Sequence, residues 1–154
     1  MKKLLLAPFA ITIIFLFSSC SWTVPFYIFN TTNEAVTVKY ELNPIDHGFA
    51  IFLEPELYLL NKKGKIKYDS IIKIKDLDPA PLVFKISVPA KSAVQIGHLN
   101  NDNYEHYDQK FINDRHFNLK SIRLLNKGEG IRIVPETFDD YFKKTSNGVI
   151  YSIE

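Results

Sequence analysis

Apolar and polar side chains alternate one by one through residues 36–42, and this pattern constrains the fold more than any other feature of the chain. The run reads, in order, Val36, Thr37, Val38, Lys39, Tyr40, Glu41 and Leu42. Successive side chains of a β-strand point to opposite faces, so strict alternation predicts a strand with one face in the core and one in water.

Other short runs rich in aromatic and β-branched residues follow, separated by turn residues. They lie at residues 26–29, 49–53, 57–60, 66–68, 71–74, 82–88, 93–97, 117–125, 131–134 and 149–153. We expect roughly eight or nine short strands from these eleven runs, which favours an all-β fold, a single β-sandwich, with a small barrel as the alternative.

Three connections between these strands follow from the turns. We expect residues 26–29 and 36–42 to form an opening hairpin, and residues 82–88 and 93–97 to be joined across a short turn at residues 89–91. The stretch at 126–130 contains two glycines and predicts a hairpin between the runs on either side of it.

One short helix is expected near the C-terminus, over residues 135–144. Phe138, Tyr141 and Phe142 are spaced to share one helix face, and Pro135 suits the first turn. Lys143 and Lys144 would lie at the end of this helix, where the helix dipole favours positive charge.

Two segments carry a resemblance to a known class of domain. The stretches Tyr27-Ile28-Phe29-Asn30 and Val88-Pro89-Ala90-Lys91-Ser92 are similar to strand and turn segments of immunoglobulin-like envelope domains. The resemblance implies an immunoglobulin-like sandwich.

The first twenty residues form a leader that ends in the single cysteine, Cys20. Lys2 and Lys3 are followed by a mostly apolar stretch, and Ser18 and Ser19 precede the cysteine. This layout resembles a bacterial lipoprotein signal peptide with residues 17–20 as the lipobox, although position 17 is phenylalanine where leucine is commonest. The resemblance implies cleavage before Cys20 and attachment of diacylglycerol to its thiol, usually with an acyl chain such as palmitate on the new amine.

Two other interpretations of the leader remain open. A transmembrane helix is disfavoured because about fourteen apolar residues rise only about 21 Å as a helix, while the hydrocarbon core needs about 20 residues. An ordinary secretory signal would leave a free thiol that has no partner for a disulfide bond.

The leader divides the chain into a signal peptide at 1–19, a lipidated tether at 20–25 and a β-sandwich domain at 26–154. Ser21 follows the cysteine, and no acidic residue stands near it. Among lipoproteins this pattern is typical of the outer membrane, facing the periplasm. Trp22 is expected to lie in the membrane interface.

The charge balance argues against a nucleic-acid partner. Lys2 and Lys3 take two of the 19 basic residues, so 17 remain after the leader against 17 acidic ones. A nucleic-acid-binding domain normally carries a clear basic excess. Since Cys20 is the only cysteine, the domain also has neither a disulfide framework nor a thiolate metal site.

The polar stretch at 98–116 is the candidate loop for a partner or ligand. Its candidate residues are His98, Asp102, Tyr104, His106, Tyr107, Asp108 and His116. Imidazoles and carboxylates suit a divalent metal, but the histidine spacing matches no compact ligand motif, so we expect a solvated loop and no metal site. For Tyr104 and Tyr107, we favour ordinary loop packing over a role in recognition.

A second candidate surface is a cluster of lysines, comprising Lys62, Lys63, Lys65, Lys67, Lys73 and Lys75. Lys65 and Lys67 would share one face of a strand, and this surface could meet anionic lipid headgroups or an acidic partner. Lysines on an edge strand also prevent sheets from associating edge to edge, and we favour this structural explanation.

Motifs of enzymes are missing from the sequence. It contains no G-x-S-x-G, no glycine-rich phosphate loop and no H-E-x-x-H, and we expect neither catalytic residues nor a cofactor. The sequence therefore predicts a lipid-anchored envelope lipoprotein that acts as a non-catalytic protein-binding or structural module near the membrane. Acylated Cys20 would hold it in membrane lipid, and an envelope protein is the expected partner. The alternatives are a metal- or small-ligand-binding lipoprotein that uses the 98–116 loop, and an immunity or inhibitor lipoprotein.

Overall fold

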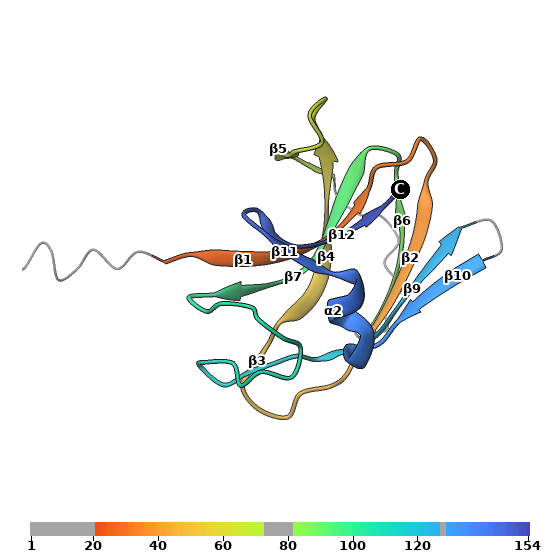
Figure 1. The fold of residues 1–154 in the computed structure, drawn as a ribbon. Coiled ribbons are helices and arrows are strands. Elements are labelled where there is room, and N and C mark those ends of the chain that lie inside the picture. Colours follow the sequence, from red (N-terminus) through yellow and green to blue (C-terminus); the bar gives the residue numbers. More distant parts are fainter. Residues whose placement is uncertain (1–20, 73–81, 127–128) are drawn as a thin grey trace, which may run out of the picture.

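Two β-sheets enclose the core of the protein (Figure 1). The computed structural model describes residues 21–72, 82–126 and 129–154. Cys20 and the leader, the proline-containing stretch at 76–81, and Lys73 and Lys75 lie outside the described residues.

The larger sheet has six strands and contains both the first and the last strand of the chain. Its order is β11 (Lys143–Thr145), β12 (Gly148–Ile153), β1 (Thr23–Asn30), β7 (Ser92–Asn100), β4 (Phe52–Leu60) and β5 (Ile66–Ile72). β1 pairs in parallel with β12, and the other neighbours in this sheet are antiparallel.

The smaller sheet has four strands, all antiparallel to their neighbours. Its order is β10 (Glu129–Ile133), β9 (Leu119–Asn126), β2 (Val36–Leu42) and β6 (Val83–Val88). A separate parallel pair consists of β3 (Phe49–Ala50) and β8 (Arg115–His116).

The predicted all-β sandwich is confirmed, and nine of the strands in the described part have five residues or more. The alternation in β2 is also confirmed, because Val36, Val38, Tyr40 and Leu42 are buried while the residues between them are partly exposed. Immunoglobulin-like sandwiches place their first strand at a sheet edge, whereas β1 lies inside its sheet, so the strand order of this chain differs from theirs.

The predicted connections are partly wrong. β1 and β2 belong to different sheets, so residues 26–29 and 36–42 form no hairpin. β6 and β7 likewise lie in different sheets, and only the hairpin of β9 and β10 is confirmed. The errors have one cause: a short turn between two strands fits an arch from sheet to sheet as well as a hairpin within one sheet.

The predicted helix is present but shorter than expected. A 3₁₀ turn, η1 (Pro135–Thr137), leads into α2 (Phe138–Tyr141), and Phe142 is already extended. The helix ends there because Lys143 pairs with Ile150 of β12, and the rings of Phe138 and Phe142 stack at 4.1 Å between centroids. Lys143 still caps the turn, since its Nζ donates to the carbonyl of Asp139 at 2.8 Å.

Residues 26–30 of β1 are buried on both faces of the sheet. Phe26 and Ile28 contribute to the main core between the sheets. Tyr27 and Phe29 point the other way and pack with Tyr58 in a second apolar cluster. This explains why the run at 26–29 is apolar throughout and does not alternate.

Candidate functional site

The loop at 101–118 lies at the end of the sandwich where β1 begins. Figure 1 shows the start of β1 beside the end of β7, in agreement with the pairing of Thr23 with Asn100. The Asn101 N–H donates to the Trp22 carbonyl at 2.9 Å, and the Trp22 N–H donates to Asn101 Oδ1 at 3.1 Å. The loop is thereby fastened to the residues that directly follow the predicted anchor.

Side chains of the loop itself hold its backbone in place. Gln109 Oε1 accepts the N–H groups of Glu105 and His106, and Gln109 Nε2 donates to the Asn103 carbonyl. Asp102 accepts the Ile112 N–H at 2.9 Å, so this predicted site residue stabilises the loop. Much of the polarity of the loop therefore serves its own structure.

Tyr104 packs in the core, since it is only 3% exposed. Its ring packs against Phe26, Phe111 and Phe138. Its hydroxyl donates to Asp139 Oδ1, and burial together with this carboxylate raises the pKa of Tyr104 far above its usual value. Tyr104 is thus a core residue that is not available to a partner.

Asp139 of α2 connects the helix to the loop. Besides the Tyr104 hydroxyl, it accepts the Tyr107 N–H at 3.2 Å, and its Oδ2 lies 4.0 Å from His106 Nδ1. No local pattern in the sequence indicates that the loop packs over the helix and contacts this carboxylate. Tyr107 is half-buried, whereas His106 and Asp108 are exposed.

His98 lies on β7, and its N–H donates to the Ile51 carbonyl at 2.9 Å. Burial and the nearby positive charge of Arg115 lower the pKa of His98, and the carboxylate of Glu56 opposes this effect. The side chain is therefore predominantly uncharged at neutral pH.

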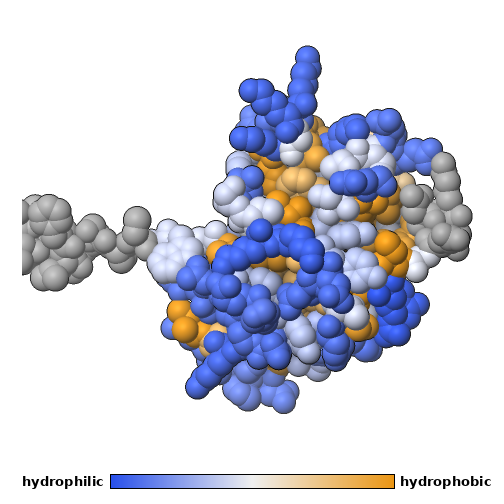
Figure 2. Space-filling model, viewed as in Figure 1, coloured by the Kyte–Doolittle hydropathy of each residue, from blue (hydrophilic) through white to orange (hydrophobic). Residues whose placement is uncertain are grey.

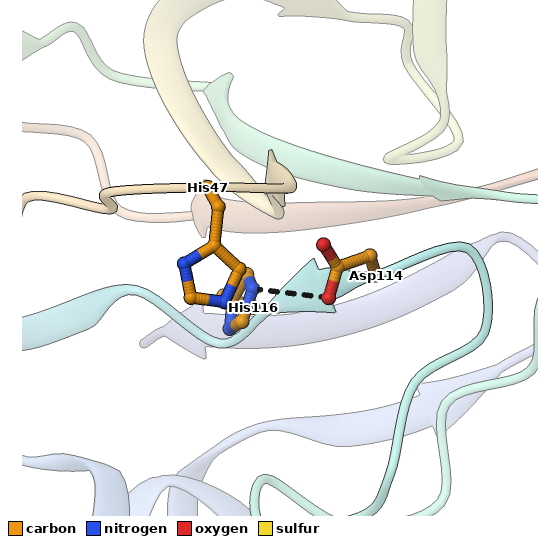
Figure 3. Close-up of side chains that lie close together, drawn as sticks. All are labelled: His47, Asp114 and His116. Carbon is orange, nitrogen blue, oxygen red and sulfur yellow. Dashed lines mark ion pairs between the residues drawn. The ribbon is translucent and has the colours of Figure 1, made fainter.

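His116 is the one predicted loop histidine that joins a group of potential metal ligands. One ligand atom each from His47, Asp114 and His116 lies within 4.8 Å of the others. His116 Nε2 is 3.6 Å from Asp114 Oδ1, and the imidazoles of His47 and His116 meet edge to face at 5.3 Å between centroids (Figure 3). We call these three residues the histidine cluster.

The parallel pair of β3 and β8 brings the two halves of the histidine cluster together. Phe49 pairs with Arg115, and the Phe49 N–H donates to the Asp114 carbonyl at 2.9 Å. His47 lies two residues before the start of β3, with Gly48 between them. Asp114 directly precedes β8, and His116 is its last residue. Backbone pairing therefore brings His47 next to Asp114 and His116, which lie far from it in the sequence.

Gly48 permits this close approach. Its φ is +78°, and a Cβ there would lie 2.1 Å from the Asp114 carbonyl oxygen and 2.8 Å from His116 Nε2. Asn113 and Asp114 also have left-handed backbones, with φ of 56° and 55°. Such conformations cost free energy and persist only where the surrounding structure enforces them.

The imidazole of His116 carries a nitrogen that is shielded from water and lacks a hydrogen bond within the described part of the chain. An unsatisfied buried polar atom costs roughly 1–3 kcal/mol. Two imidazoles and a carboxylate are suitable ligands for a divalent transition metal. Sequence reasoning missed His47, because its only local signal is the turn at His47-Gly48.

The described members of the lysine cluster, Lys62, Lys63, Lys65 and Lys67, lie at the other end of the sandwich. The turn that carries Lys62, Lys63 and Lys65 adjoins Leu60, and the Leu60 N–H donates to the Lys91 carbonyl. Lys91 Nζ in turn donates to the carbonyl of Thr31, the residue after the end of β1. Lys67 lies on β5, an edge strand. In Figure 2 the tip of this hairpin is hydrophilic, and apolar surface lies at its base. The position fits edge protection better than contact with headgroups near the anchor.

Within residues 21–72, 82–126 and 129–154, no helix has the length and apolar character needed to cross a membrane. Comparison of the chain with protein-family models, with curated proteins and with solved structures found no match.

Proposed function

We propose that this protein is a lipid-anchored lipoprotein of the cell envelope that binds an envelope protein close to the membrane and has no catalytic activity. The observation that carries the proposal is the attachment of the 101–118 loop to Trp22 and the start of β1. Cys20, as the acylated residue, would therefore hold this loop end of the domain against the bilayer.

The distance from anchor to domain supports this orientation. β1 begins at Thr23, three residues earlier than expected, so only Ser21 and Trp22 separate it from Cys20. At about 3.3–3.6 Å per residue, Thr23 lies at most about 11 Å from the anchor. Trp22 is 49% exposed, as suits a side chain of the membrane interface.

Two or more acyl chains would make the attachment lasting, because each buried CH₂ contributes about 0.8 kcal/mol and a single chain binds only marginally. Confinement to a thin layer raises the local concentration of any partner in that layer. His106 and Asp108 are exposed at the loop end and are available to such a partner. The outer membrane, with the domain facing the periplasm, is the proposed location.

The anchor is tested by mass spectrometry of the N-terminal peptide from membranes of cells that express the full chain. We expect a peptide that begins at Cys20 and carries the mass of a diacylglycerol group. The Cys20→Ser variant should keep its leader. An N-terminal peptide with an unmodified thiol would refute the lipoprotein assignment.

The binding surface is tested by photocrosslinking in intact cells, with a photoreactive residue at Asp108 or, as the matched control, at Lys62 on the opposite end. We expect one discrete adduct from position 108 that is lost when Cys20 is also changed to serine. Adducts only from position 62, or equal adducts without the anchor, would contradict the proposed surface.

A further inference from the structure

We propose that His47, Asp114 and His116 form a binding site for a single divalent transition-metal ion of the zinc class. The inference goes beyond the proposed function, because it requires neither the anchor nor a protein partner. It rests on the convergence of three ligand side chains and on the hydrogen-bond state of His116.

The spacing of the ligand atoms is close to what a metal ion needs. Zinc bonds of about 2.0–2.1 Å in a tetrahedral arrangement place neighbouring ligand atoms about 3.3 Å apart. His116 Nε2 and Asp114 Oδ1 are already 3.6 Å apart, and no pair in the cluster exceeds 4.8 Å. The His47 side chain is exposed, so it has room to turn toward the other two ligands.

A bound metal ion would give His116 Nε2 a partner, which an ion pair between His116 and Asp114 does not. At 3.6 Å, His116 Nε2 and Asp114 Oδ1 are too far apart for a hydrogen bond, and Nε2 is shielded from solvent. An ion pair would also leave the edge-to-face approach of His47 without a role. A metal ion between the three side chains satisfies Nε2 and gives each of them a ligand function.

The ligand set selects the class of metal. Imidazole nitrogen favours zinc and its transition-metal neighbours, whereas calcium and magnesium take oxygen ligands. Three protein ligands leave a fourth position for water or for an external ligand. Since His47 and Asp114 are exposed, that position faces solvent.

The backbone around the cluster is built for these side chains. Gly48 leaves the space that a Cβ would fill between Asp114 and His116, and the left-handed backbone at Asp114 lies at the same place. Strained backbone of this kind concentrates at functional sites. The β3–β8 pair joins the two halves of the site in advance, so binding needs little reorganisation.

The test uses the full chain, purified in detergent and stripped of metal with a chelator. Cobalt(II) is the spectroscopic probe, and zinc is titrated by calorimetry. We expect saturation at one equivalent, the intense visible absorption of four-coordinate cobalt, and displacement of cobalt by zinc but not by calcium. No saturable binding at micromolar protein would overturn the proposal.

Variants assign the site. His47→Ala and His116→Ala should each weaken zinc binding by at least about tenfold, while His106→Ala, a matched change at an exposed histidine outside the cluster, should leave it unchanged. Zinc binding by His47→Ala with the affinity of the original chain would also overturn the proposal.

A measurement on the unaltered chain guards against variants that fail to fold. Nuclear magnetic resonance of the histidine rings should show zinc-dependent shifts for His47 and His116, with His98 and His106 unaffected. Shifts confined to His98 or His106 would place the metal elsewhere and refute the site.

Discussion

Replacing Asn30 with alanine should destabilise the domain more than any other change of a polar side chain near the turn that follows β1. Asn30 is 0% exposed at the end of β1, and its Nδ2 donates to the carbonyls of Val88 and Pro89, both at 2.9 Å. It also donates to the Glu34 carbonyl, and its Oδ1 accepts from the N–H and hydroxyl of Thr32. The amide thereby joins β1 of one sheet to β6 of the other.

The magnitude follows from these bonds. The two Nδ2 hydrogens and two bonds to Oδ1 make about four hydrogen bonds, each with a net worth of about 1 kcal/mol. The bond to the Val88 carbonyl is fully buried, whereas water can replace partners at the partly buried positions. We therefore expect Asn30→Ala to lower the free energy of unfolding by about 2–4 kcal/mol.

The assay is urea and thermal unfolding of residues 21–154, followed by circular dichroism. For about 130 residues, an unfolding entropy of about 2.1 cal/mol/K per residue converts this loss to a drop of about 7–15 °C in Tm. The m-value should stay unchanged, because the native fold is retained.

The matched control is Asn33→Ala, an exposed asparagine in the same turn, which should change the unfolding free energy by less than about 0.5 kcal/mol. Equal losses for the two variants would refute the reasoning, since the effect would then come from the turn and not from the buried amide.

Gly48→Ala should lower the free energy of unfolding by about 2–4 kcal/mol, because a Cβ would clash with the Asp114 backbone and φ is +78°. Gly64→Ala is the control: its φ is +71° but the space around it is open, so it should cost only about 1 kcal/mol. Unfolding in urea compares the two variants. Tyr104→Phe removes a part-buried hydroxyl that donates to a carboxylate and should cost about 1–3 kcal/mol in the same assay. The pKa of His98 is lower in the folded protein than in the unfolded chain. As the pH falls below about 6.5, the unfolded chain therefore binds a proton at His98 before the folded protein does, and the free energy of unfolding decreases. The loss of Tm between pH 7.5 and 5 should be smaller in His98→Gln than in the original chain, with His106→Gln as the exposed control; equal losses in all three would contradict the assignment.

The strands themselves could be predicted from local patterns. The alternation in residues 36–42 and the turn residues between runs reflect which side chains face the core, and this information is local. The hairpin of β9 and β10 was predictable because its turn lies between two strands that pair directly. The helix was predictable up to Phe142, where pairing of Lys143 with β12 overrides helical spacing.

The candidate site was predicted only in part. His116 lies in the polar stretch that the composition indicates, but its neighbour His47 comes from the loop after β2. Two residues of that stretch, Tyr104 and Asp102, have structural roles, because one packs in the core and the other holds the loop. A polar composition indicates where a loop runs, and does not distinguish side chains that hold it from side chains that it presents.

The sequence by itself determined that this chain forms short strands with one or both faces apolar, and it predicts a lipoprotein leader that ends at Cys20. Only the tertiary structure decided which strands are neighbours, that β1 pairs with both β7 and β12, and that His47 meets His116. The physical reason is that a period of two specifies which face of a strand is buried, whereas partner and register depend on long-range packing that selects among turns of equal local quality.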